Sequence, residues 1–463
     1  MTDIKNATTK RAMIALIFSL AWPTMLEQLM QTAVQYVDLA MVGSLGTDAA
    51  AAVGSTTTVN WLLGSTISAL GVGFLAIIAK AIGASDKSLV KRASAQTVFI
   101  TLIAGTVFTV IPLALSPVVP ALMNVKPHLR ADAALYFFIL YTPKLFRTST
   151  VIFGTALRAS GDTKTPMRVG VLVNIVNVVL NFFMIYDSRV VKIFGSEIKV
   201  FGFGFGVIGA AVASAIAFAV GGILITVSLF MHPLLSPRGE SIKPDMTVLR
   251  PCLRVALPNM LQRFCTSFGY VCFASMINSL GEVATAAHTF ANTVESAFYI
   301  PGFGMQTAVA TLAGNAYGAN DNDKMKQMTS MIIKIELILM LLSGTLLFSF
   351  AQALMGFFSN DPEVIRLGGT VLRMVALSEP FYGVSIIIEG MLLGVGRTVT
   401  PFKFNVIGMW GVRIFGTFIV TTFFSGGLEA AWGCMIAQNL LVFVLYVIHY
   451  KNGKWNPLEH KKA

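Results

Sequence analysis

Residues 21–46 read AWPTMLEQLMQTAVQYVDLAMVGSLG, and residues 256–281 read ALPNMLQRFCTSFGYVCFASMINSLG. Both segments have a proline at their third position and end in Ser-Leu-Gly. They open a longer correspondence, because residues 21–91 align with residues 256–326 without a gap. This internal repeat indicates that the chain consists of two halves of common ancestry.

The composition is that of a membrane protein. The 463 residues are 55% hydrophobic and only 12% charged, whereas a soluble protein carries about 25% charged residues. Apolar stretches long enough to cross a hydrocarbon core of about 30 Å as helices recur along nearly the whole chain. A large soluble helical protein is excluded, because such a sequence could not cover its surface with polar groups.

We therefore predict an all-α polytopic membrane protein with twelve transmembrane helices, six in each half. The predicted spans are residues 13–43, 50–79, 94–116, 133–155, 167–187, 205–231, 252–278, 284–315, 328–352, 368–393, 402–424 and 428–449. They form an N-lobe at residues 13–231 and a C-lobe at residues 252–450, joined by a cytoplasmic linker at residues 232–251. Polar tails at residues 1–12 and 451–463 flank the lobes. Duplicated membrane domains of this kind are typical of transporters, whose substrate site lies between the repeats.

The net charge of +12 is distributed unevenly along the chain. In a soluble protein such an excess of positive charge would suggest a nucleic-acid partner. Here the position of the charges argues against nucleic acid, and we expect the protein to lie in a lipid bilayer. Lysine and arginine gather in both tails and in the even-numbered connections, as in Lys87, Lys91 and Arg92 after the second span. This positive-inside asymmetry predicts a multi-pass protein of the plasma (inner) membrane with both termini in the cytoplasm.

The sequence lacks the motifs of an enzyme. It contains no phosphate loop, no nucleophile elbow and no zinc spacing, and its four cysteines form no metal-binding pattern. We predict no enzymatic activity and no cofactor. Without an ATP-binding motif, any uphill transport must use an ion gradient.

The first predicted span carries a polar stripe on one helical face. Its members are Gln28, Gln31, Gln35 and Asp38. Glu27 lies about three turns before Asp38 and points nearly the same way. An ionisable group within a membrane span is costly and indicates function by default. Glu27 could instead be solvated at the cytoplasmic interface, and Asp38 lies within two turns of the outer end.

The fifth span offers a partner face with Asn174, Asn177 and Asn181. Such asparagines can simply join helices by hydrogen bonds. Amide oxygens together with a carboxylate also suit a small hard cation, and a carboxyl group in a dehydrated site could instead take up a proton. The spacing leaves interhelical bonding, sodium and proton binding open.

The chain resembles the multidrug and toxic compound extrusion (MATE) transporters over essentially its full length. The motifs that carry this resemblance are YVDLAMVGSLG at residues 36–46, ALRASGDTKTP at 156–166, the asparagines of the fifth span and GVIGAAVAS at 206–214. The resemblance implies two six-helix bundles around a V-shaped central cavity. It also implies a monomeric secondary active exporter of organic, often cationic or amphipathic compounds, in antiport with H⁺ or Na⁺ by alternating access.

The resemblance further implies a cation-coupling site in the N-lobe. The family's acid in the first span matches Asp38, its polar pair in the fifth span matches Asn177 and Asn181, and its hydroxyl in the sixth span matches Ser214. If the ion is sodium, Asp38, Asn177 and Asn181 would be its ligands. Some members have a second carboxylate at the position of Asn181, and its absence leaves Asp38 as the main charge.

The C-lobe departs from the family pattern. One subgroup has acids in the seventh and tenth spans, where this chain has Thr266 and Tyr382. Glu379 lies one turn before Tyr382 and could replace the second acid, and Glu295 in the eighth span is a further candidate. Each could instead be neutralised by an arginine such as Arg413.

Acids, aromatic side chains and two glutamines of the polar stripe are our candidates for the substrate cavity. An acid would raise the local concentration of cationic compounds, and aromatic faces attract cations. The candidates are Glu27, Gln31, Gln35, Glu295, Glu379, Tyr270 and Tyr299.

Two other functions remain as alternatives to drug export. A flippase for lipid-linked oligosaccharides or lipids, built on a related fold, would need a strongly cationic cavity. Basic residues in or near the predicted spans are Lys144, Arg147, Arg263, Arg373 and Arg413. A membrane-embedded enzyme is the second alternative, which no paired His, Ser/Lys or metal spacing favours.

Overall fold

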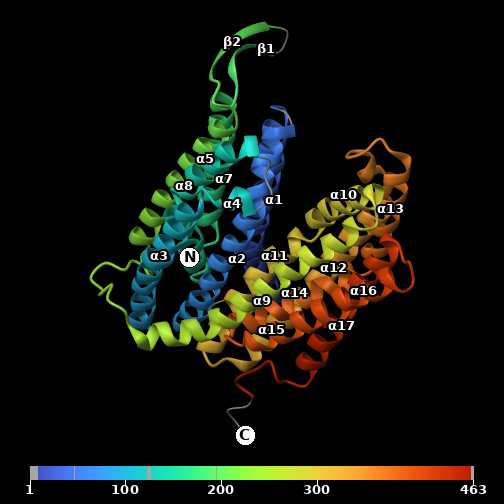
Figure 1. Cartoon of the computed structure of the whole chain (residues 1–463). Coiled ribbons are helices and arrows are strands. Elements are labelled where there is room, and N and C mark those ends of the chain that lie inside the picture. Colours follow the sequence, from blue (N-terminus) through green and yellow to red (C-terminus); the bar gives the residue numbers. More distant parts are fainter. Residues whose placement is uncertain (1–8, 46, 123–126, 194–195, 460–463) are drawn as a thin grey trace. The chain divides into compact units, whose positions relative to one another are not determined.

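The computed structural model describes residues 9–45, 47–122, 127–193 and 196–459, and helices make up most of them. The elements of the first half are α1 (Lys10–Gly43), α2 (Thr47–Gly83), α3 (Lys87–Leu115), α4 (Val119–Leu122), η1 (Pro127–Leu129), α5 (Arg130–Tyr141), α6 (Lys144–Ala159), α7 (Lys164–Met184), β1 (Asp187–Ile193), β2 (Ser196–Phe203) and α8 (Gly206–Met231) (Figure 1). Those of the second half are α9 (Met246–Asn278), α10 (Glu282–Phe298), α11 (Ile300–Gly318), α12 (Asn322–Gly356), α13 (Pro362–Ala376), α14 (Glu379–Gly394), α15 (Val399–Val406), the π-helix η2 (Ile407–Ile414), α16 (Phe415–Thr422) and α17 (Leu428–Lys451).

Every predicted span coincides with a helix or with consecutive helices in the described parts of the chain, so the prediction of an all-α polytopic membrane protein is confirmed. By length and apolarity alone, eight described helices can cross a membrane, or nine if the bent pair α13 and α14 forms one span.

Three predicted spans are broken into two helices. α5 and α6 are separated at Pro143, α10 and α11 just before Pro301, and α13 and α14 before Pro380 with a bend of 54°. Proline lacks an amide hydrogen and disfavours the helical conformation in the residue before it. Proline alone does not decide where a break falls, because Pro23, Pro112 and Pro258 lie inside the continuous helices α1, α3 and α9.

The chain forms two compact units. The hairpin unit contains Leu26–Phe74 and Ser88–Leu249, and the larger unit contains the described residues of Met1–Met25, Leu75–Lys87 and Arg250–Ala463. α1 and α2 each contribute to both units. The lobe limits drawn from the sequence stay a prediction.

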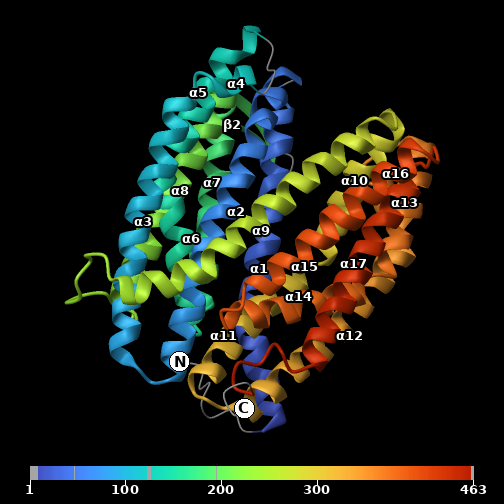
Figure 2. The same cartoon turned by 60° about the horizontal axis from the view of Figure 1, so that its bottom comes forward.

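The hairpin unit is organised around α8, which packs on α5, α6 and α7 (Figure 2). The contact with α6 is close, since a Cβ at Gly222 would lie 2.7 Å from the Phe146 Cα. Small residues allow membrane helices to approach in this way. The antiparallel strands β1 and β2 extend the unit between α7 and α8 (Figure 1).

The larger unit packs α12 against α13 and α14, α11 against α14, and α17 against α13 and α14. Its core includes the fully buried Trp432, whose indole N–H donates to His288 Nδ1 at 3.2 Å. Gly83 and Gly318, which are equivalent in the internal repeat, make reciprocal contacts here. A Cβ at Gly83 would meet the carbonyl oxygen of Asn315, and one at Gly318 would meet that of Lys80.

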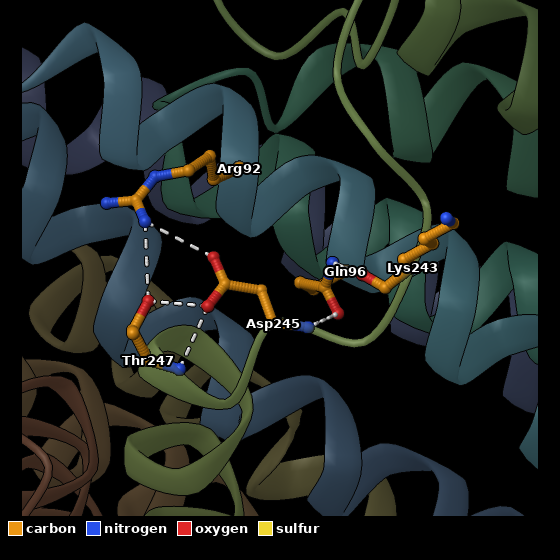
Figure 3. Close-up of polar contacts among 5 residues, drawn as sticks. All are labelled: Arg92, Gln96, Lys243, Asp245 and Thr247. Carbon is orange, nitrogen blue, oxygen red and sulfur yellow. Dashed lines mark hydrogen bonds and ion pairs between the residues drawn. The ribbon is translucent and has the colours of Figure 1, made fainter.

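The connection between α8 and α9 is held against α3 by polar contacts (Figure 3). The Gln96 side chain donates to the Lys243 carbonyl oxygen at 2.8 Å and accepts from the Asp245 amide at 3.1 Å. Asp245 accepts from Arg92 at 3.2 Å and from the backbone and hydroxyl of Thr247 at 2.9 and 2.6 Å. The hydrogen bonds from Thr247 and the charge of Arg92 lower the pKa of Asp245 below its ordinary value.

Candidate functional site

The residues expected to couple a cation meet within the hairpin unit. α1 provides Asp38, α7 provides Asn177 and Asn181 one turn apart, and α8 provides Ser214. Asn181 Nδ2 donates to Asp38 Oδ1 at 2.6 Å. The Asn177 amide is satisfied when its Nδ2 faces the carboxylate, donating to Asp38 Oδ1 at 2.9 Å and Oδ2 at 3.2 Å, while its oxygen accepts from Ser214 Oγ at 3.0 Å.

The site is shielded from water but not closed. The exposed fractions of Asn177 and Asn181 are 6% and 1%, and Asp38 is half-buried. The Asn181 Oδ1 atom is buried and accepts no hydrogen bond from the described residues. Leaving a buried acceptor unsatisfied costs about 1–3 kcal/mol. The carboxylate and this unused amide oxygen are both ligands that a hard cation accepts.

The same arrangement also shows what a bound ion must displace. Two amide N–H groups donate to the Asp38 carboxylate. A cation or an added proton would compete with them for the same carboxylate oxygens. Among the described residues there is no cluster of three His, Cys, Asp or Glu side chains that could hold a metal. A sodium ion would therefore depend on the amide and hydroxyl oxygens around one carboxylate.

The other polar residues of the two stripes lie outside this network. Gln31 and Gln35 form no hydrogen bond with it in the described structure, and Gln35 is exposed. The Asn174 Nδ2 atom is buried without a partner in the described residues. Helical periodicity predicted which side chains share a face, but could not tell which turns would meet a neighbouring helix.

Glu27 is buried in an ion pair. Arg158 Nη2 donates to its two carboxylate oxygens at 2.8 and 2.6 Å, and only 8% of the surface of Glu27 is exposed. Gly170 leaves room for it, because a Cβ there would lie 3.2 Å from the Glu27 Cγ. Burial rules out the solvated position that the sequence left open. The partner, in the ALRASGDTKTP segment, was not identified from the sequence.

Among its described residues, the larger unit contains three buried acids. The exposed fractions of Glu295, Glu336 and Glu379 are 8%, 0% and 1%. The Glu336 carboxyl group lies against α11 and α14, since a Cβ at Gly302 or Gly383 would lie 2.9 or 3.1 Å from its Oε1. From the sequence, Glu336 is an acid in an otherwise apolar span, and its nearness to Lys334 favoured a structural role over a place among the candidate substrate contacts.

An arginine and several aromatic side chains belong to the same unit. The Arg413 guanidinium lies over the rings of Tyr270 and Phe273, 5.1 Å from each centroid. Tyr299 packs edge-on against Tyr382, with their ring centroids 5.8 Å apart. Arg413 forms no ion pair with an acid among the described residues, so its suggested role as a neutralising partner is not seen as a direct contact.

The MatE family model matches the chain twice, at residues 23–183 and 258–419. The two matches begin at Pro23 and Pro258, which are equivalent in the internal repeat. The chain belongs to the MatE family. Members of this family are transporters, so the chain is a membrane transporter and not an enzyme.

Relatives of this MatE chain align over nearly its whole length. The "Probable multidrug resistance protein NorM" of Thermotoga maritima is 28% identical over 446 residues, covering 95% of this chain and 92% of the relative. The "Probable multidrug resistance protein YoeA" of Bacillus subtilis is 26% identical, covering 93% and 92%.

Solved structures share the fold. One described as the "Outward-facing conformation of a multidrug resistance MATE family transporter of the MOP superfamily" has a TM-score of 0.87 at 23% identity and covers 96% of each chain. A second, "Crystal structure of MATE in the bent conformation", has a TM-score of 0.87 at 22% identity and covers 97% of each chain.

Proposed function

We propose that this MatE transporter exports organic compounds, often cationic or amphipathic, by secondary active antiport with H⁺ or Na⁺. Relatives named as multidrug resistance proteins support the substrate class. The observation that carries the coupling proposal is the Asp38 carboxylate, shared between two asparagine amides of another helix. In this proposal Asp38, Asn177, Asn181 and Ser214 form the ion site.

Coupling follows from competition at Asp38. With no ion bound, the amides of Asn177 and Asn181 satisfy the carboxylate. An arriving cation takes their place, and the amides turn away or offer their oxygens. An ion can drive a conformational change only by its differential affinity for the two states. Because α1 contributes to both units, a change around Asp38 acts on a helix common to both.

The test is dye movement in proteoliposomes under a proton gradient alone and then a sodium gradient alone. We expect one gradient to drive export by the wild type and Asp38→Asn to lose this coupling while staying folded. Asp132→Asn is the matched control, because Asp132 is exposed on the first turn of α5. Full ion-driven export by Asp38→Asn would refute the proposal.

Orientation and assembly belong to the same proposal. We place the transporter in the plasma (inner) membrane as a monomer, with both termini in the cytoplasm. The supporting observation is the concentration of lysine and arginine in the tails and the even-numbered connections. Glu27, Gln31, Gln35, Glu295, Glu379, Tyr270 and Tyr299 remain the proposed substrate contacts, although Glu27 is engaged by Arg158 in this structure.

A further inference from the structure

The hairpin unit contains two basic side chains, one buried and one half-buried, that ion coupling at Asp38 does not use. Lys144 is the first residue of α6, directly after the break at Pro143, and its exposed fraction is 6%. Its Nζ lies 3.4 Å from Asn60 Oδ1 and 4.5 Å from the centroid of the Tyr141 ring. Arg147, one turn later, holds its guanidinium 4.9 Å from the centroid of the Phe218 ring.

Neither Lys144 nor Arg147 forms an ion pair with an acid among the described residues. The ion pairs of Arg92 and Arg158 in the hairpin unit are with Asp245 and Glu27. Glu27 is already paired, because both of its carboxylate oxygens accept from Arg158. An amide oxygen and aromatic faces compensate a buried cation only in part. Within the part of the chain that the structure describes, the two basic side chains therefore have no paired counter-charge.

A neutral donor accompanies the two cations. The hydroxyl of Tyr141 is buried and has no hydrogen-bond partner in the described structure, and the ammonium of Lys144 lies over the same ring. Asn60 and Arg147 keep part of their surface exposed, so the group is not sealed within the core. The start of α6 adds the positive end of a helix dipole.

We propose that Lys144, Arg147 and the Tyr141 hydroxyl form a subsite for an anionic oxygen group, a carboxylate or phosphate, of the exported compound. A guanidinium matches such a group with paired donors, and an ammonium acts on it as a point charge. The inference rests on the proposed export function and extends its substrates from cations to amphipathic acids and zwitterions. The anionic group supplies a counter-charge that no described residue provides by an ion pair.

The probe is a pair of dyes that differ only in the acid: rhodamine B, which has a free carboxylate, and its ethyl ester. Binding to the purified full chain in phosphatidylcholine nanodiscs is measured by fluorescence anisotropy. We expect the wild type to bind the acid about tenfold more tightly than the ester, the scale of a charge-assisted contact. In Lys144→Met/Arg147→Gln this preference disappears, while affinity for the ester is kept.

Matched variants separate binding from folding. Lys164→Met/Arg168→Gln removes two exposed cations of α7 and must keep the acid preference. Lys144→Arg preserves the charge and must also keep it, which leaves the proposal testable if the double variant of α6 does not fold. A wild type without acid preference, or a double variant that weakens the acid and the ester equally, would overturn the inference.

The anionic group could also come from a lipid headgroup, and a second arm distinguishes this source. The measurement is repeated in nanodiscs that contain phosphatidylglycerol. We expect the acid preference to persist. If phosphatidylglycerol abolishes it in the wild type, the subsite holds a lipid phosphate and the assignment to an exported compound is wrong.

Measuring the transport of the two dyes in addition to their binding distinguishes a failure of the anion subsite from a failure of the proposed export function. Ion-driven export of the ester without any acid preference in binding would leave the export proposal standing and refute the subsite. An acid preference in binding without ion-driven movement of either dye would refute the export proposal while the anion subsite stands.

Discussion

Asp38 is satisfied by neutral amide donors and not by a basic side chain. A carboxylate leaves a neutral amide more easily than it leaves an arginine, because the guanidinium adds the attraction of a full opposite charge and paired donors. Glu27 shows the contrast, since Arg158 donates to both of its oxygens. The two acids of α1 therefore differ in chemistry: Asp38 can exchange its partners for an ion, whereas Glu27 is held in a fixed ion pair.

The Glu27–Arg158 pair predicts a loss of stability when it is broken. Glu27→Gln leaves the buried guanidinium without that carboxylate, and removing one partner of a buried ion pair costs about 3–5 kcal/mol. We expect a clearly lower unfolding temperature in detergent, measured by the loss of the monodisperse peak after heating. The exposed Glu282→Gln on α10 is the control. An unchanged unfolding temperature in Glu27→Gln would show that the pair contributes little.

At the level of the elements, the position of a polar side chain depends on where a helix breaks and on which helix a connecting segment packs against. The predicted span at residues 133–155 is broken at Pro143, which makes Lys144 the first residue of a new helix. The connection after α8 is held in place by α3, because the Gln96 side chain forms hydrogen bonds with its backbone at Lys243 and Asp245 (Figure 3). Asp245 also starts α9 by accepting from the Thr247 amide.

The lowered pKa of Asp245 predicts a pH dependence of stability. Because the pKa in the folded protein is below the ordinary value of about 3.9, the stabilising contribution is complete above that ordinary value. It is lost as the pH falls through the lower pKa of the folded state. Asp245→Asn retains an N-cap side chain but removes the charge. We expect the wild type to unfold at a higher temperature than Asp245→Asn at pH 7, with the difference shrinking below about pH 4.

The control for this measurement is Asp132→Asn, an exposed acid with no hydrogen bond to a helix start. A difference between the wild type and Asp245→Asn that stays constant from pH 7 to pH 3 would contradict the assigned role of the charge. The effect is expected to be small, because ion pairs at the surface contribute little.

In the whole molecule, equivalent residues of the internal repeat also pack against each other's helices. Gly83 contacts the helix that contains Asn315, and Gly318 contacts the helix that contains Lys80. The two equivalent glycines therefore make the same kind of contact in opposite directions. Only a residue without a Cβ fits at either position. Gly43 and Gly433, by contrast, have open space around the position of a Cβ.

This reciprocity predicts matched effects of matched substitutions. Gly83→Ala and Gly318→Ala should each lower stability by about 1–3 kcal/mol, since overpacking displaces the neighbouring backbone. The double variant should cost less than the sum, because both changes act on the same contact. Unfolding temperatures of the two single variants and the double variant provide the test, with Gly433→Ala as the control. Unequal single effects or strict additivity would argue against a shared contact.

Part of the site was accessible from the sequence. Asp38, Asn177, Asn181 and Ser214 were named through the family resemblance, and helical spacing placed the asparagines on one face. Gln31 and Gln35 share the stripe of Asp38 but lie outside its hydrogen bonds. Spacing tells which side chains point the same way, whereas contact depends on where the neighbouring helix crosses.

The helical class and the spans could be predicted from the amino-acid sequence, because apolar length and periodicity are local properties of the chain, and its self-alignment revealed the duplication. Which buried charges are neutralised became known only from the packing of the helices. Glu27 and Arg158 are 131 residues apart in sequence yet form an ion pair, while Lys144 and Arg147 form none in the described structure. A counter-charge from a distant segment is a consequence of packing, and no local pattern in the chain encodes it.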